Sequence, residues 1–215
     1  MAGLFKWSVR KSDAAPAAAP PAVSPEPALT ASKVLPRFLA VVSHQPAPVL
    51  VDLGGVVGAN VSFFGDRLSC RLIVEDLVAL VEAHAKRPGP GGLSAAFAKQ
   101  LGTLEPESVD GILCWDLFDY LDRKTGQELA ARLATLLKKG GALYGFFGTT
   151  PAELTHYTRF VVQAPDAFRH RRYPATPTRR QVLMNRDLAK MFEGLTVAES
   201  VLLKTGARET LFRKS

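Results

Sequence analysis

Apolar positions alternate between two spacings from about residue 30 to the end of the chain. Continuous apolar runs of strand length occur at "APVLVDLG" (47–54), "CRLIVED" (70–76), "SVDGILCWD" (108–116) and "ALYGFFG" (142–148). The segments between them show helical spacing, over residues 30–45, 59–68, 77–86, 93–101, 126–141 and 185–192. This alternation predicts an α/β fold, a mostly parallel sheet with helices on both faces in a three-layer sandwich.

The end of the chain has a different pattern. Residues 195–203 and 209–214 are two strand-like runs that flank "KTGAR". This spacing predicts a C-terminal antiparallel hairpin with its turn at Gly206.

Two further segments divide the chain. Residues 13–29 are almost wholly Ala and Pro, so residues 1–29 are expected to be a disordered tail in front of a domain that spans residues 30–215. Within that domain, "HYTRFVVQAPDAFRHRRYP" (156–174) has the pattern of an inserted basic hairpin with "QAPD" as its turn.

Composition narrows the class of protein. Of the 215 residues, 47% are hydrophobic and 22% charged, as in globular domains. No apolar run approaches the roughly 20 residues of a membrane span, and the N-terminus lacks the features of a secretory signal. Cys70 and Cys114 lie in apolar runs as small core residues, outside any metal-ligand cluster, so no structural zinc is predicted. A reducing cytoplasm is the expected location.

Positive charge gathers in the last third of the chain. Residues 151–215 hold 12 Lys and Arg against 6 Asp and Glu, which accounts for most of the net charge of +7. A nucleic-acid surface or a surface for an acidic substrate is one interpretation. A solvated basic face is favoured, because no ladder of aromatic residues accompanies the charge.

Acids and glycines stand where the predicted strands end. In an open α/β sheet, ligands bind at the carboxyl ends of the strands. Glycines there let the backbone approach a ligand closely, and a carboxylate after the second strand accepts hydrogen bonds from ribose hydroxyls. The candidate cofactor-binding residues are Asp52, Gly54, Gly55, Gly58, Glu75 and Asp116.

With these residues in place, the sequence over 33–215 resembles the class I S-adenosylmethionine-dependent methyltransferases. "DLGGVVG" (52–58) is similar to the family's acid-x-Gly-x-Gly-x-Gly motif, "VDGILCWDLFDYLD" (109–122) to its fourth-strand motif, and "LLKKGGALYGFFG" to its step into the fifth strand. The resemblance implies a seven-stranded sheet that binds S-adenosylmethionine across its strand ends. Asp52 and the glycine loop would hold the methionine part, Glu75 the ribose, and Asp116 would be a further cofactor contact.

The resemblance leaves several points open. Val56 replaces the middle glycine of the motif, and a β-branched residue tolerates left-handed backbone poorly, so the loop is expected to follow a different backbone path. A working cofactor site is favoured over a degenerate one. No catalytic residue and no adenine contact are assigned. The methyl acceptor is unidentified, although a basic hairpin suits an acidic or phosphorylated one.

Two alternatives compete with this interpretation. Tyr120-x-x-x-Lys124 has the spacing of the catalytic pair in short-chain NAD(P)-dependent oxidoreductases, but it comes too early after the glycine turn for that family. The other alternative is a binding or scaffold protein that keeps the methyltransferase fold without its chemistry. Its tail and basic segment would then serve a partner.

Overall fold

The computed structural model describes residues 28–89 and 91–215. The predicted disordered tail therefore lies almost entirely outside the described residues. Leu29, its last residue, already belongs to strand β1 (Leu29–Ala31), which pairs with β7. Within the described residues no helix is long and apolar enough to cross a membrane.

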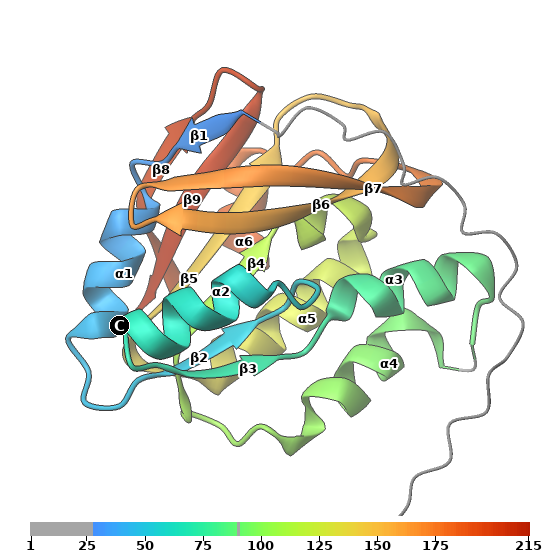
Figure 1. The fold of residues 1–215 in the computed structure, drawn as a ribbon. Coiled ribbons are helices and arrows are strands. Elements are labelled where there is room, and N and C mark those ends of the chain that lie inside the picture. The colour runs from blue at the N-terminus through green and yellow to red at the C-terminus, as the bar shows by residue number, and fades with distance from the viewer. Residues whose placement is uncertain (1–27, 90) are drawn as a thin grey trace, which may run out of the picture.

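A six-stranded sheet forms the centre of the molecule (Figure 1). Its strand order is β3-β2-β4-β5-β9-β8, with β2 parallel to β3 and β4, β4 parallel to β5, and β9 antiparallel to both of its neighbours. The strands are β2 (Val49–Asp52), β3 (Arg71–Val74), β4 (Val109–Trp115), β5 (Leu137–Gly148), β8 (Leu195–Leu202) and β9 (Ala207–Lys214). The predicted C-terminal hairpin is confirmed, and Gly206 has the positive φ of +78° that its turn requires.

The expectation of seven strands in this sheet is wrong, because the segment that would supply the family's third strand is helical. It forms α4 (Gly92–Gln100) and a short 3-10 turn, Leu101–Thr103. The sequence from Leu93 to Leu101 contains no β-branched residue, and it buries Phe97 and Leu101 at helical spacing. The sheet consequently ends at β3.

Helices cover both faces of the sheet. They are α1 (Leu35–Ser43), α2 (Gly58–Ser62), α3 (Leu77–Lys86), α4, α5 (Arg123–Leu136) and α6 (Asn185–Met191), with a π-helical turn at Phe63–Arg67 and a 3-10 turn at Leu117–Tyr120. One apolar core joins α3, α4, α5 and α6 to the sheet, and a second joins α1 and the π-helical turn to its other face. Successive residues of β2 alternate between them: Leu50 packs in the second core and Val51 in the first. The two cores confirm the three-layer arrangement.

A second sheet lies over the carboxyl end of the first. Strands β6 (Glu153–Ala164) and β7 (Ala167–Arg179) form a long antiparallel hairpin, to which β1 adds a third strand. Figure 1 shows this hairpin crossing above α2 and reaching α3. Phe160, Val162 and Phe168 point into the second core, so one face of the hairpin is buried against the domain.

Both cysteines are part of the interior. Cys114 lies in the first core and Cys70 in the second, each as a free thiol. Burial raises the pKa of both thiols, Cys114 most strongly, which keeps them protonated and unreactive. They are small core residues, as the sequence indicated.

Candidate functional site

The centre of the candidate site is the end of β2, where the strand order reverses between β2 and β4. Asp52, 2% exposed, accepts hydrogen bonds at Oδ1 from the Gly54 backbone N (2.9 Å) and from Trp115 Nε1 (2.6 Å). Burial raises the pKa of Asp52 to about 6, and the nearby Asp76 carboxylate adds to this, while the two hydrogen bonds oppose it. A charge on Asp52 is therefore retained at a cost to stability.

The three glycines of the loop have different roles. A Cβ at Gly54 would lie 2.8 Å from Trp115 Cδ1, so this glycine makes room for the indole that binds Asp52. A Cβ at Gly55 would lie 3.1 Å from Arg159 Nε, so Gly55 lies directly beneath an arginine of β6. A Cβ at Gly58 would meet no atom within 4 Å.

Val56 fits the loop without strain. None of residues 54–58 has a positive φ, so the left-handed backbone that a β-branched residue resists is not needed. The Val56 side chain is 61% exposed and borders the 170 Å³ cavity beneath the hairpin. The replacement of the motif's middle glycine is thus compatible with an intact loop.

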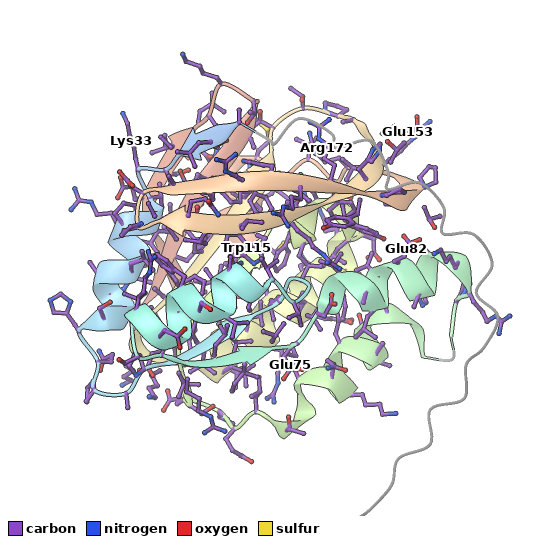
Figure 2. All side chains as sticks on the ribbon, in the orientation of Figure 1. Lys33, Glu75, Glu82, Trp115, Glu153 and Arg172 are labelled. Atoms are coloured by element: carbon purple, nitrogen blue, oxygen red, sulfur yellow. The ribbon has the colours of Figure 1, made fainter. Side chains whose placement is uncertain are left out.

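The two acids after β3 point to different places. Glu75 accepts a hydrogen bond from Gln100 Nε2 of α4 (2.8 Å), and Figure 2 shows it on the side of β3 away from the hairpin. Asp76 has a left-handed backbone (φ 35°) and caps α3 by accepting from the Ala79 N (3.1 Å). Asp76, rather than Glu75, lines a cavity together with Gly55. The structure therefore brings Asp76 to the glycine loop and leaves Glu75 outside.

Two further acids follow β4: Asp116, which is half-buried, and Asp119, which is buried. Burial, followed by the charge of Asp119, raises the pKa of Asp116 to about 7, and a hydrogen bond with Thr158 of β6 opposes the rise. Asp119 forms an ion pair with Arg180 (2.8 Å) and accepts from the Gly148 N (2.9 Å). Burial still raises the pKa of Asp119 to about 6. Groups whose pKa is displaced in this way gather at functional sites.

Asn60 anchors the part of the β6–β7 hairpin around Phe160 and Val162 to the glycine loop. This buried side chain donates from Nδ2 to the Phe160 carbonyl (2.9 Å) and accepts at Oδ1 from the Val162 N (2.8 Å). The Phe160 ring stacks between Trp115 (centroids 5.0 Å apart) and Phe146 (4.7 Å). Figure 2 places Trp115 beneath the hairpin. The hairpin is therefore bound to the same tryptophan that binds Asp52.

Glu82 of α3 anchors the part of the hairpin around Tyr157 and Thr176. Its carboxylate accepts hydrogen bonds from the Tyr157 hydroxyl, from the backbone N and hydroxyl of Thr176 (both 3.0 Å) and from Lys86 Nζ (2.9 Å). Partial burial would raise its pKa, but these hydrogen bonds outweigh burial and lower it to about 2.

Two small cavities follow the glycine loop beneath the hairpin. One, of about 190 Å³, is lined by Gly55, Asp76, Glu82, Thr158 and other residues, and the next, of about 170 Å³, by residues 56–59 together with residues of β6 and β7. Arg159 and Tyr173 line both, because the Arg159 guanidinium lies over the Tyr173 ring at 4.5 Å. This stacked pair is the wall between the two cavities.

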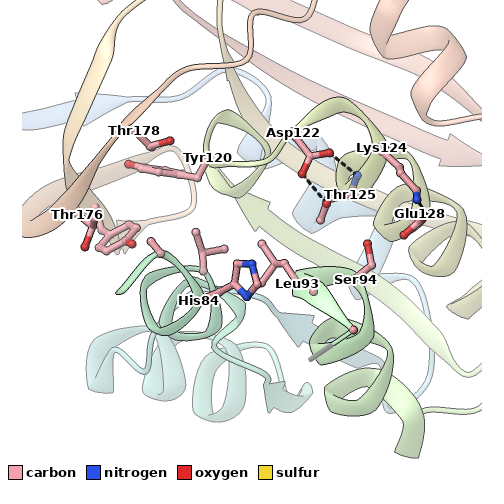
Figure 3. A pocket seen from close by; sticks show the side chains of 15 residues that line it. His84, Leu93, Ser94, Tyr120, Asp122, Lys124, Thr125, Glu128, Thr176 and Thr178 are labelled. Atoms are coloured by element: carbon pink, nitrogen blue, oxygen red, sulfur yellow. Dashed lines mark hydrogen bonds and ion pairs between the residues drawn. The ribbon is translucent and has the colours of Figure 1, made fainter. Parts of the chain in front are cut away.

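A larger cavity of about 670 Å³ lies farther from the loop, between α3, α4, α5 and the far end of the hairpin. Tyr157 lines both this cavity and the 190 Å³ one, so the two are neighbours. Figure 3 shows Tyr120 and Thr178 at one end of it and Lys124 and Glu128 at the other.

The Tyr120 and Lys124 pair does not have the arrangement of an oxidoreductase site. The Tyr120 hydroxyl donates to the His156 carbonyl (2.7 Å), and Lys124 pairs with Glu128 (4.0 Å). Burial raises the pKa of Tyr120, whereas acid catalysis by a tyrosine near neutral pH requires a lowered one.

Sequence reasoning missed the residues that the hairpin brings to the site. Asn60 stands two residues after the quoted glycine motif, but its partners lie about 100 residues away, on β6. Arg159 belonged to a predicted basic hairpin whose position over the loop had no local signal. Asp76 is adjacent to the predicted Glu75, and a left-handed backbone at that residue decides which of the two faces the cavity.

Comparison with known proteins supports the fold. No protein-family model matches the sequence, and no curated protein matches it. The PH0226 protein from Pyrococcus horikoshii OT3 aligns over 85% of this chain and 89% of its own, with 11% identity and a TM-score of 0.51. The CcbJ methyltransferase from Streptomyces caelestis aligns over 84% of this chain and 94% of its own, with 17% identity and a TM-score of 0.49.

A further similar structure is the 1,6-didemethyltoxoflavin-N1-methyltransferase from Burkholderia thailandensis, solved with S-adenosylhomocysteine bound. It aligns over 86% of this chain and 79% of its own, with 16% identity and a TM-score of 0.48. Antiparallel β9 lies between β5 and β8, so the predicted C-terminal hairpin is part of the main sheet. The chain therefore shares its α/β fold, a mostly parallel sheet with helices on both faces, with the PH0226 protein.

Proposed function

We propose that this protein binds S-adenosylmethionine beneath the β6–β7 hairpin and transfers its methyl group to an acceptor. The observation that carries the proposal is the pair of cavities along residues 54–59 at the switch point between β2 and β4. Ligands of open α/β sheets bind at this place. When bound, S-adenosylmethionine supplies an electrophilic methyl carbon on its sulfonium sulfur.

The fit of the cofactor depends on one side chain. Binding sites for ligands of this size occupy about 300–1,000 Å³, so neither cavity is large enough alone. The wall between them is the exposed Arg159 side chain, which rotates at little cost. With Arg159 turned away from Tyr173, the two cavities join into one groove along the loop. Backbone and core residues keep their positions in this change.

The residues of the joined groove suit the parts of the cofactor. We assign the ribose hydroxyls to the Asp76 carboxylate, which lines the groove beside Gly55. The methionine part is assigned to residues 54–58, with Asp52 close beneath. Gly58 and Asp116 remain candidate contacts, and Glu75 is retained as the comparison residue. The neighbouring 670 Å³ cavity is large enough for the methyl acceptor.

Calorimetric titration with S-adenosylmethionine and S-adenosylhomocysteine tests the proposal. Asp76→Asn keeps the α3 cap but loses the charge that ribose hydroxyls favour, so binding is expected to weaken about 10-fold or more. Glu75→Gln is the matched control at the adjacent position and is expected to bind as wild type does. Absence of binding to the wild type at millimolar ligand would refute the proposal. Equal losses in both variants would refute the role of Asp76.

The second candidate is a scaffold protein in which the hairpin covers the strand ends and leaves no access for a cofactor. The double hydrogen bond of Asn60 and the stacked Phe160 favour it, because they hold the hairpin down over the strand ends. Amide hydrogen exchange separates the two candidates. A cofactor-binding protein is expected to gain protection at residues 54–59 and 157–161 when S-adenosylhomocysteine is added. A closed scaffold is expected to show no change at any concentration.

A further inference from the structure

Two arginines lie side by side on the hairpin above the glycine loop. Arg159 of β6 is directly opposite Arg171 of β7 in the antiparallel register. Like charges at opposed positions of an antiparallel pair destabilise it. Among residues 28–89 and 91–215, no carboxylate forms an ion pair with either guanidinium. Within the part of the chain that the structure describes, the pair is therefore a local concentration of positive charge without an ion-pair partner.

The Arg159 guanidinium lies between Tyr173 and the glycine loop. Its Cζ lies 4.5 Å from the centre of the Tyr173 ring, and three of its atoms come within 3.4 Å of the place where a Cβ of Gly55 would be. The planar guanidinium of an arginine presents its N–H groups as a fork that matches the two oxygens of a carboxylate or phosphate.

The cavity between these arginines and the loop contains no acidic group. Its 170 Å³ are lined by Val56, Val57, Gly58, Ala59, Arg159, Val161, Arg171 and Tyr173. Two cations and an aromatic ring converge there from the hairpin, and small or apolar residues face them from the loop. The volume suits a single small group better than a whole ligand.

We propose that Arg159 and Arg171 form a binding site for an oxyanion, a carboxylate or a phosphate group. The proposal deepens the proposed function, because the anion is either the carboxylate of the cofactor's methionine part or an acidic group of the methyl acceptor. A single rotation of the Arg159 side chain serves two roles, contact with the anion and opening of the wall between the two cavities. Turning from Tyr173 toward the 170 Å³ cavity, it contacts the anion and joins the two cavities at the same time.

The matched control is Arg172, the next residue on β7. Successive side chains of a strand point to opposite faces, and Figure 2 shows Arg172 on the side of the hairpin away from the loop. Arg172→Gln removes the same charge from the same strand without altering the cavity. Arg159→Gln and Arg171→Gln remove the charges that line it. All three side chains are exposed, so the folded state is expected to persist, which circular dichroism verifies.

The probe is inorganic phosphate, titrated by calorimetry at low ionic strength. Wild type and Arg172→Gln are expected to bind it equally, and Arg159→Gln and Arg171→Gln to bind it at least 10-fold more weakly. Arg159→Lys keeps the charge but loses the fork, and an intermediate affinity is expected. Equal affinity in all variants, or no binding to wild type at tens of millimolar phosphate, would overturn the proposal.

A second titration identifies the source of the anion. S-adenosylhomocysteine carries the methionine-type carboxylate, whereas 5′-methylthioadenosine lacks it. Displacement of phosphate by the first compound and not by the second assigns the site to the cofactor. Simultaneous binding of phosphate and S-adenosylhomocysteine assigns it to the acceptor. If phosphate binds through the two arginines and S-adenosylhomocysteine does not bind, the anion site stands and the proposed function fails.

Discussion

Asp52 and Glu82 are two carboxylates whose pKa values are shifted in opposite directions, and the hairpin lies above both. Glu82 accepts hydrogen bonds from a tyrosine, a threonine and a lysine, and its pKa falls to about 2. Asp52 accepts hydrogen bonds from Trp115 and Gly54, yet burial raises its pKa to about 6. Glu82 is a satisfied charge that stabilises the fold, whereas Asp52 is a charge that the fold retains at a cost.

Asp116 and Asp119 share the behaviour of Asp52. All three acids stand at or just beyond the ends of β2 and β4, and burial raises the pKa of each to about 6 or 7. Costly charges gathered at a switch point indicate a ligand site, while a satisfied charge at a helix flank indicates structure. The opposite pKa shifts of Asp52 and Glu82 therefore distinguish the proposed site from the structural contacts that hold the hairpin over it.

The largest expected effect comes from removing Trp115, the residue that joins Asp52 to the hairpin. Trp115→Ala deletes a buried indole between Asp52 and Phe160 and is expected to destabilise the protein by about 3–5 kcal/mol, measured by urea denaturation. Trp115→Phe keeps most of the ring but leaves Asp52 without its side-chain donor, for a smaller loss of about 1–3 kcal/mol. A loss under about 1 kcal/mol in the alanine variant would show that the hairpin does not depend on Trp115.

The second effect is a pH dependence at Asp52. Its folded pKa of about 6 exceeds its ordinary value of 3.8, so the native state binds more protons than the unfolded state between these pH values. Stability then falls as pH rises through this window. Asp52→Asn removes that fall and is expected to gain about 1–3 kcal/mol relative to wild type between pH 4 and pH 7. A constant difference across that range would contradict the raised pKa.

Glu82 is expected to show the reverse slope with a smaller effect. Its folded pKa of about 2 lies below its ordinary value of 4.5, so it contributes stability above pH 4.5 that is lost as pH falls toward 2. Glu82→Gln is expected to cost about 1–2 kcal/mol at pH 7. Amide exchange should quicken near Tyr157 and Thr176 and remain unchanged in β4. Equal acceleration in both places would mean that Glu82 does not act on the hairpin alone.

The smallest effect concerns the loop. Val56 is 61% exposed and needs no left-handed backbone, so Val56→Gly relieves no strain. The added freedom of the unfolded chain should cost up to about 1 kcal/mol. Affinity for S-adenosylhomocysteine is expected to stay equal or weaken slightly. A gain of about tenfold, or 1.4 kcal/mol, would mean that Val56 blocks the site.

Local sequence signals predicted much of the fold. Residues 77–86 showed helical spacing and form α3 with those bounds, and the apolar runs before Asp52 and Asp116 form the two central strands. These elements could be predicted because the spacing of apolar residues within each segment is sufficient to indicate a helix or a strand. The third strand of the family was expected from resemblance alone, and the local helical pattern of residues 93–101 prevailed over it.

The candidate site was only partly predictable. Asp52 and the glycines were visible because a strand end and a turn are local features. The position of Arg159 over Gly55 and the hold of Asn60 on β6 depend on contacts between distant segments. The choice between Glu75 and Asp76 depends on one backbone dihedral, the positive φ of Asp76, and the next residue donates its N–H to the Leu53 carbonyl, far away in the sequence.

The central claim is that the strand-end acids are kept charged at a cost because they serve a cationic cofactor. Carboxyl-carbon NMR titration, with and without saturating S-adenosylmethionine, tests it most directly. In the free protein, Asp52 is expected to titrate near pH 6 and Glu82 near pH 2. The positive sulfonium and ammonium groups of the cofactor should lower the pKa of Asp52 and leave that of Glu82 unchanged. An Asp52 that titrates at its ordinary value, or that does not respond to the cofactor, would contradict the account.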